Sequence, residues 1–291
     1  MIFSSSARII SLLALACLLQ SCSAAKLAYN QATELGYWYL DGYVDFSSEQ
    51  SLQVKDELSK LQAWHRQTQL PSYIDMLQKL QQKVPADVTA LEACGIFTEV
   101  RRKFVLLSDQ TQPAVVAMLD SLSSNQLDAM GRKFDKGNAE FRSDYLQLAK
   151  PANQSKRYKR AVSRAEMLYG RLDDKQLALV ALQVEKSRFN PTLAYAERQR
   201  RQQDTLQTLR SLVKNQSTTD QKRLAVRGLF ERAVASPNPN HNVYVDGLVQ
   251  DSCKNFADLH NSTTASQRRK AVATLLGYEQ DMKTLSAQGN G

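Results

Sequence analysis

The sequence predicts an all-α protein whose helices pack as hairpins into one elongated or bundle-like body. Glycine and proline together supply only 18 of 291 residues, about half of their usual share. Leu, Ala, Gln, Lys, Arg and Glu, all good helix formers, fill the remaining positions. Apolar residues recur three or four positions apart, and one helix-start signal occurs five times.

The helix-start signal is Ser, Thr or Asp followed three residues later by Gln. This pattern predicts a capping box, in which the first side chain accepts from the N3 amide and the glutamine reaches back to the N-cap amide. The five pairs are Ser47 with Gln50, Ser123 with Gln126, Asp173 with Gln176, Thr218 with Gln221 and Thr264 with Gln267. The last four are 50, 45 and 46 residues apart, a spacing typical of successive helical hairpins.

Apolar stripes at helical spacing follow these starts. They comprise Val54, Leu58 and Leu61; Tyr73, Leu77, Leu80 and Val84; Leu206, Leu209 and Val213; and Val272, Leu275, Leu276, Met282 and Leu285. Prolines 71, 85, 113, 151 and 191 are expected between the stripes, with Asn190 as N-cap before Pro191. Residues 236–242 read as a loop, and 242–249 as an isolated hint of a strand.

The N-terminal segment predicts a lipid anchor. The apolar run Ile9–Leu19 has eleven residues, too few to span a bilayer but suited to a signal peptide. It ends in Leu19-Gln20-Ser21-Cys22, a lipobox, so we expect cleavage after Ser21 and acylation of the Cys22 thiol. Ser23 in place of aspartate favours delivery to the outer membrane. An ordinary secreted protein is the alternative, and three N-x-[ST] triplets would suit a eukaryotic route.

These signals divide the chain into four parts. We expect a signal peptide over 1–21, an anchor and aromatic segment over 22–48, an all-helical domain over 49–286, and a flexible tail over 287–291. The 270 residues after the signal suffice for one large domain or two small ones with substantial cores.

The net charge of +9 becomes +8 when Arg8 leaves with the signal. An exported protein does not normally meet nucleic acid, so the expected polyanions are anionic lipid headgroups, glycolipid and cell wall. The best candidate for an anionic-surface contact is a basic cluster with few nearby acids, Lys156, Arg157, Lys159, Arg160 and Arg164. A solvated helix face is the alternative reading of this cluster.

Two cysteines remain after Cys22, at Cys94 and Cys253. An oxidising compartment favours a disulfide between them, with two buried thiols as the alternative. No CxxC and no cysteine at ligand spacing from a histidine is present, so we expect neither a metal site nor a cofactor.

The densest aromatic cluster, Tyr37, Trp38, Tyr39, Tyr43 and Phe46, surrounds Asp41 and Asp45. On a helix the two carboxylates would share one face and could act as acid and base, although Gly42 is expected to interrupt that helix. The favoured alternative is an aromatic face that packs on the body. His65 could join such a site, but no nucleophile elbow, zinc motif, phosphate loop or dinucleotide fingerprint is present.

Several strings make the chain resemble an uncharacterised family of Gram-negative lipoproteins without an assigned activity. They are residues 39–46 (YLDGYVDF), Trp64-His65-Arg66, Leu70-Pro71, residues 197–204 (ERQRRQQD) and residues 259–264 (LHNSTT). A weaker similarity is to small helical periplasmic chaperones with an L-T-x-x-Q motif, matched by residues 122–126 (LSSNQ) and less well by 172–176 (LDDKQ).

The leading hypothesis is therefore a non-enzymatic, outer-membrane-tethered helical protein that binds an envelope protein or anionic glycolipid through a basic or amphipathic concave face. One alternative is an envelope hydrolase or transferase that uses Asp41, Asp45 and His65. Another is chaperone-like holding of unfolded clients, which predicts an exposed apolar groove.

Overall fold

The computed structural model describes residues 24–147, 150–215 and 217–288, and within these ranges it contains helices and no strand. The helices are α2 (Ala24–Asn30), α3 (Ala32–Val44), α4 (Ser48–Trp64), α5 (Leu70–Lys83), α6 (Ala90–Met118), α7 (Ser124–Phe141), α8 (Lys150–Tyr169), α9 (Asp174–Glu185), α10 (Pro191–Lys214), α11 (Thr219–Val234), α12 (Pro239–Asn261) and α13 (Ala265–Ala287). The all-α prediction is confirmed. Cys22, the predicted lipid-carrying residue, lies outside the described residues.

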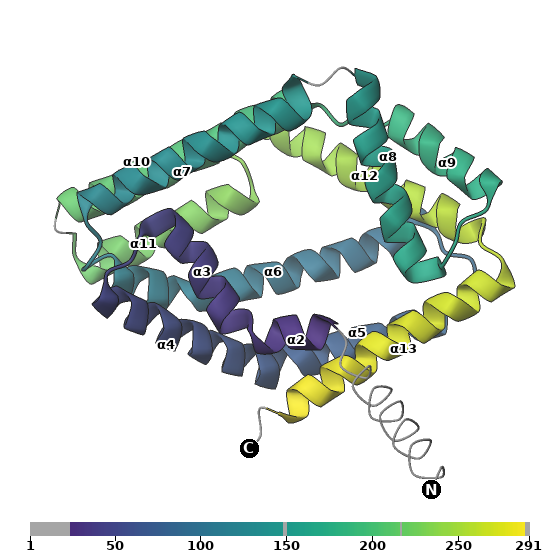
Figure 1. The fold of residues 1–291 in the computed structure, drawn as a ribbon, viewed down its shortest axis with the longest axis horizontal. Helices are drawn as coiled ribbons and strands as arrows, with labels where there is room; N and C mark the ends of the chain where they lie inside the picture. Colours follow the sequence, from purple (N-terminus) through teal and green to yellow (C-terminus); the bar gives the residue numbers. More distant parts are fainter. Residues whose placement is uncertain (1–23, 148–149, 216, 289–291) are drawn as a thin grey trace, which may run out of the picture.

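The helices are arranged as a frame (Figure 1). α7 and α10 lie side by side along one side, and α5 and α13 pack together along the opposite side. α8, α9 and α12 form one end of the frame, while α3 and α4 lie at the other. α6 packs against α11 near one end and α12 near the other, so it crosses the frame.

Two short π-helical turns extend the rods of this frame. His65–Gln69 (η1) joins α4 and α5 into one continuous rod, and Arg142–Leu146 (η2) extends α7. A π-turn inserts an extra residue into the helical ladder and shifts the faces that follow it. The apolar stripes of α4 and α5 therefore differ in phase, which lets α4 pack on α3 while α5 packs on α13.

The apolar core is divided among separate clusters where rods meet. One cluster joins α6, α7, α10 and α11 through Val116, Leu119, Leu127, Leu209, Leu212 and Val226. A second joins α5, α8 and α13 through Leu77, Val84, Tyr169, Ala271 and Leu275, and a third joins α8, α9 and α12 around Leu172, Val180 and Leu259. The core is therefore distributed over several helix junctions and does not form one centre.

All five predicted capping boxes are present, each with both reciprocal hydrogen bonds. Thr89 and Glu92 form a further box at the start of α6, which the search for glutamine did not detect. Asn190 caps α10 before Pro191 as predicted, because its Oδ1 accepts from the amides of Thr192 and Leu193.

Four of the capping-box glutamines also pair across helix junctions. Gln50 of α4 and Gln126 of α7 exchange side-chain amide hydrogen bonds, with N···O distances of 3.3 and 2.6 Å. Gln176 of α9 and Gln267 of α13 do the same at 2.8 Å in both directions. These two junctions lie at opposite ends of the frame (Figure 1).

The two glutamine pairs share a further geometric rule. The side-chain amide of each glutamine also donates to a main-chain carbonyl next to its partner. The accepting residue lies two positions before the N-cap of the partner's helix. The four bonds run from Gln50 to Ser121, Gln126 to Asp45, Gln176 to Ser262 and Gln267 to Arg171, over 2.7 to 3.1 Å. Each junction thus has local two-fold symmetry, and two helix starts satisfy one another's main-chain groups as well as their own.

A disulfide between Cys94 of α6 and Cys253 of α12 fixes the end of the crossing helix, with a Cα–Cα distance of 5.2 Å. The loop it closes spans 159 residues. On sequence grounds this pairing was favoured over two buried thiols.

Some local sequence predictions were wrong. Gly42 does not interrupt its helix, because α3 continues to Val44. Pro113 lies inside α6, where the flanking turns supply enough tertiary contact to offset one lost main-chain hydrogen bond. The loop predicted at 236–242 ends at Asn238, which caps α12 through its side chain, and the strand-like residues 242–249 belong to that helix.

In the described part of the chain, no helix is both long and apolar enough to cross a bilayer.

Candidate binding grooves

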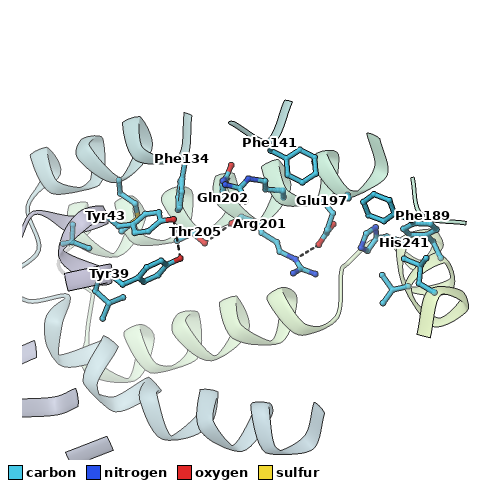
Figure 2. Close-up of a pocket in the computed structure, with 18 residues that line it drawn as sticks. Tyr39, Tyr43, Phe134, Phe141, Phe189, Glu197, Arg201, Gln202, Thr205 and His241 are labelled. Atoms are coloured by element: carbon cyan, nitrogen blue, oxygen red, sulfur yellow. Dashed lines mark hydrogen bonds and ion pairs between the residues drawn. The ribbon is translucent and has the colours of Figure 1, made fainter. Parts of the chain in front are cut away.

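Two adjoining depressions on the described surface form the candidate site. The first, which we call the aromatic groove, is an open cavity of about 710 Å³ between α3, α7, α10, α12 and the α9–α10 connection. Figure 2 shows Tyr39, Tyr43 and Phe134 at one end, Phe189 and His241 at the other, and polar side chains of α10 between them. Its size lies within the range of small-molecule and peptide sites.

Helical spacing places the aromatic side chains on shared faces. Tyr39 and Tyr43 are one turn apart on α3, and Phe134 and Phe141 are two turns apart on α7. Tyr43 packs against Phe134 with ring centroids 5.8 Å apart, which joins α3 to α7. The Tyr39 and Tyr43 hydroxyls are hydrogen-bonded over 3.5 Å, and this bond together with burial raises the pKa of Tyr43. Tyr39 itself stays 60% exposed.

Glu197 is the buried acid on the α10 side of the groove. Its carboxylate accepts from Arg200 over 2.8 and 2.9 Å, from Arg201 over 2.9 Å and from the Ser236 hydroxyl over 3.0 Å. Burial alone would raise the pKa of Glu197, but these hydrogen bonds outweigh it and lower the pKa to about 2. Glu197 is therefore ionised at neutral pH and holds two arginines in place.

Arg201 presents donors to the groove. Its Nε donates to Glu197, and its two Nη groups have no partner among the described residues. The side chain is 45% exposed, and Figure 2 shows the guanidinium beside Glu197 at the open side of the groove. A guanidinium with free Nη donors is suited to a carboxylate or phosphate.

Beside Arg201, an amide network fixes the side of the groove formed by α7 and α10. Asn138 of α7 accepts from Arg198 Nε over 2.9 Å and donates to Gln202 over 2.7 Å. The Arg198 guanidinium lies over the Phe141 ring, 5.9 Å from its centroid. Arg198 is therefore held against the aromatic wall, while Arg201 is held by Glu197 through its Nε.

The second depression, which we call the apolar groove, has a volume of about 330 Å³ between α3, α4, α6 and the ends of α7 and α10. Aliphatic side chains dominate its lining, among them Leu40, Val44, Val54, Leu58, Leu61, Ala114, Val115, Met118, Leu119, Leu122, Met130 and Leu209. Glu57, Lys60 and Gln110 also lie along its lining.

The two grooves are contiguous. Leu40, Val44 and Met130 line both of them. α10 runs past both: Arg201 and Thr205 line the aromatic groove, and Leu209, one turn further on, lines the apolar groove. The two adjoining grooves, which together we call the concave track, change from an aromatic and cationic lining to an aliphatic one.

The carboxylates singled out in the sequence serve the local fold. Asp41 Oδ1 accepts from the Phe46 amide over 3.0 Å, which closes the end of α3. Asp45 is the left-handed residue after α3, with φ of 58°, and its carbonyl accepts from Gln126. His65 bonds the Tyr29 hydroxyl through Nδ1 over 2.8 Å, and burial lowers the pKa of its ring. None of these contacts brings the three side chains together.

The basic cluster lies on α8 and lines neither groove. Lys156 pairs with Asp144 over 2.9 Å, Arg157 lies 4.9 Å above the centroid of the Phe189 ring, and Arg160 bonds the Tyr145 hydroxyl. Lys159 and Arg164 are exposed and have no partner in the described ranges. Much of the cluster thus supports internal packing, and its contact with an anionic surface stays a prediction.

The other two histidines are also accounted for. His260 is fully buried and lies between the Tyr169 hydroxyl at 2.9 Å and the Ala86 carbonyl at 2.8 Å, where burial lowers the pKa of its ring. His241 lines the aromatic groove. Across the described residues no group of three or more His, Cys, Asp or Glu side chains could hold a metal ion.

Sequence reasoning recognised part of this site and missed the rest. Tyr39 and Tyr43 were singled out, as was the string that contains Glu197 and Arg201, but as separate features. Phe189 was not identified because it lies in a connection. The sequence did contain a signal for the aromatic lining, because aromatic residues recur at helical spacing, as Tyr39 and Tyr43 do on α3 and Phe134 and Phe141 do on α7.

Comparison with known proteins identifies one family. Residues 42–230, about two thirds of the chain, match the Family of unknown function (DUF6279). No curated protein and no solved structure matches the chain. The matched region includes α4 to α10 and most of α11, and therefore most of the lining of both grooves.

Proposed function

This chain belongs to the DUF6279 family, and we propose for it a non-enzymatic binding role at the outer membrane, to which it is tethered through Cys22. In this role the concave track binds another component of the cell envelope. The observation that carries the proposal is the continuity of the aromatic and apolar grooves at Leu40, Val44 and Met130.

Exposed apolar surface supports a binding role. Monomeric proteins rarely leave large contiguous apolar patches open to water unless a partner covers them. Leu40 lies at the junction of the two grooves, Tyr39 lies beside it in the aromatic groove, and both are exposed. The aromatic lining adds Phe134, Phe141 and Phe189, and aromatic side chains with a few placed polar groups are typical of ligand pockets.

The N-terminal helices support a position close to a membrane. α2 begins two residues after Cys22. Leu27, Leu35 and Trp38 on α2 and α3 are 65, 52 and 74% exposed, so this end of the chain presents large apolar side chains outward. Tryptophan next to apolar residues is favoured at the membrane interface. The positive net charge of the chain suits anionic headgroups.

In-cell photo-crosslinking tests the binding role. A photoreactive residue replaces Tyr39 in the aromatic groove, Gln110 in the apolar groove, or Leu224 on α11, which is 72% exposed and lines neither groove. We expect adducts with a discrete envelope component from positions 39 and 110 and none of that component from position 224. Equal adducts from all three positions would contradict the proposal.

The tether is tested separately. Mass spectrometry of the mature N-terminal peptide should show acyl chains on Cys22, and Cys22→Ser should move the protein out of the outer-membrane fraction. An unmodified Cys22 in a cytosolic precursor would overturn the proposed location while leaving the groove measurements intact.

A second candidate function is chaperone-like holding of unfolded clients. Two observations favour it: the open apolar groove, and a row of exposed apolar residues on α6 at Phe97, Val100 and Phe104. A holdase should suppress aggregation of a denatured client at stoichiometric ratios. Loss of that suppression in Phe97→Ser/Phe104→Ser, with Leu224→Ser as control, would support this function over the first.

A further inference from the structure

The concave track changes its chemistry along its length, and this gradient restricts what it can bind. One end offers the free Nη donors of Arg201 beside aromatic rings, and the other offers aliphatic walls. We propose that the two grooves together bind one anionic amphiphile, with its acidic headgroup at Arg201 and its acyl chain in the apolar groove. This inference rests on the proposed binding role and names its ligand class.

The apolar groove has the chemistry of an acyl-chain site. Leu58 and Leu61 from α4 face Ala114, Val115 and other aliphatic residues of α6 across it. Each methylene that leaves water for such a surface contributes favourably and without directional requirements. An aliphatic chain can therefore fill a groove that has few hydrogen-bonding groups.

The length of the track suits a single acyl chain. Arg201 and Leu209 are eight residues apart on α10, which corresponds to about 12 Å along the helix axis. An acyl chain in a bilayer leaflet extends about 15 Å, half of the hydrocarbon thickness. A headgroup at Arg201 therefore places the chain past Thr205 and Met130 into the apolar groove.

The charge near Arg201 favours an anion. Glu197 is shared by Arg200 and Arg201, and Asp204 forms a two-point ion pair with Arg232 at 2.9 and 2.8 Å. Both acids are thus satisfied by other groups, while Arg198 lines the groove with no carboxylate partner in the described chain. The aromatic groove has an excess of positive charge, and an incoming carboxylate or phosphate would find donors already oriented.

Displacement of a fluorescent fatty acid tests the assignment. The full chain with Cys22→Ser carries no acyl group of its own, and oleate, oleyl alcohol and a reduced, unfolded polypeptide serve as competitors. We expect oleate to displace the probe at a concentration at least tenfold lower than oleyl alcohol requires. Arg201→Gln should abolish that difference. Arg227→Gln is the control, because Arg227 on α11 also pairs with a glutamate four residues away on its own helix, as Arg201 does on α10. This substitution should leave the difference between oleate and oleyl alcohol unchanged.

Two variants test the tail end of the track. Ala114→Phe fills the apolar groove and should weaken both oleate and oleyl alcohol at least tenfold. Since Ala114 is half-buried and a larger residue could disturb α6, Leu40→Glu provides a second test at an exposed junction position. It should also weaken oleate at least tenfold, with thermal unfolding unchanged.

Equal displacement by oleate and oleyl alcohol, or an undiminished difference in Arg201→Gln, would overturn the headgroup assignment. Displacement by the unfolded polypeptide alone would show a polypeptide groove, in which case the ligand class is wrong and the proposed binding role still holds. Failure of the proposed role itself would appear as absence of position-specific crosslinks in cells.

Discussion

The paired glutamines predict a large and specific loss of stability from one polar substitution. Gln176 is 1% exposed, and its side chain takes part in four hydrogen bonds: with the Asp173 amide, with the Ser262 carbonyl, and two with Gln267. A typical intramolecular hydrogen bond contributes about 0.5–1.5 kcal/mol net. Gln176→Ala should therefore lower the free energy of unfolding by about 2–5 kcal/mol.

Gln221 provides a matched control. It is also the N3 glutamine of a capping box, with Oε1 accepting from the Thr218 amide over 2.9 Å, but no glutamine in the described part of the chain pairs with it. Gln221→Ala should cost only about 0.5–1.5 kcal/mol, the value of one hydrogen bond. Urea unfolding followed by circular dichroism measures both losses on the same chain.

A double-mutant cycle then isolates the pair itself. The coupling energy between Gln176→Ala and Gln267→Ala should be about 1–3 kcal/mol, because two hydrogen bonds join the two side chains directly. If Gln176→Ala costs no more than Gln221→Ala, or the coupling is near zero, the glutamine pair does not hold this junction and our reasoning about the frame is wrong.

Three further predictions concern stability. Replacing Cys94 and Cys253 together by Ser should lower the unfolding free energy by up to about 5 kcal/mol, since the disulfide closes a 159-residue loop in the unfolded chain; reduction of the wild-type protein should reproduce most of that loss. The pKa of Glu197 is lowered to about 2. The contribution of its ionised carboxylate to the free energy of unfolding is therefore complete above the ordinary pKa of about 4.5 and is lost as the pH falls from 4.5 to 2. Between pH 7 and pH 2.5 the wild type should lose about 1–3 kcal/mol more of its free energy of unfolding than Glu197→Gln does, as measured by urea unfolding at both pH values. Asp45→Gly should stabilise the protein by about 0.5–1 kcal/mol in thermal unfolding, because φ is 58° at this position; destabilisation would mean that the Asp45 side chain has a role beyond its backbone.

The sequence was informative where a local rule determines the structure. Each predicted capping box forms, since the cap and its glutamine are only three residues apart and their geometry is set within one turn. The pairing of Gln50 with Gln126 could not be predicted in the same way, because it depends on how distant helices meet. The regular spacing of the boxes suggested neighbouring hairpins, whereas the actual partners are 76 and 91 residues apart.

Tertiary contacts also explain the wrong local predictions. Residues 242–249 contain three valines and a tyrosine, residue types that favour strands, but Pro239 with its Asn238 cap starts a helix and contacts with α6 maintain it. Gly42 and Pro113 break isolated helices more readily than packed ones. In each case packing outweighs a local preference of a few kcal/mol or less.

The candidate site was the least predictable feature. Asp41 and Asp45 were considered for chemistry because they share a helix, yet one caps that helix and the other ends it. The grooves combine residues from six of the described helices that no local spacing connects, and only the arginine string on α10 and the tyrosines on α3 were visible beforehand. Arg201 becomes distinctive only when Glu197 is seen to engage its Nε and leave its Nη groups open.

The most direct test of the central claim is the methyl NMR signal of Met130, which lines both grooves. Detergent extract of the cell envelope would be titrated into methyl-labelled protein, with detergent alone as reference. We predict that Met130 and Met118 shift while Met167, an exposed residue of α8 outside the grooves, does not. A shift of Met167 with Met130 and Met118 unchanged would contradict the assignment of the concave track as the binding face.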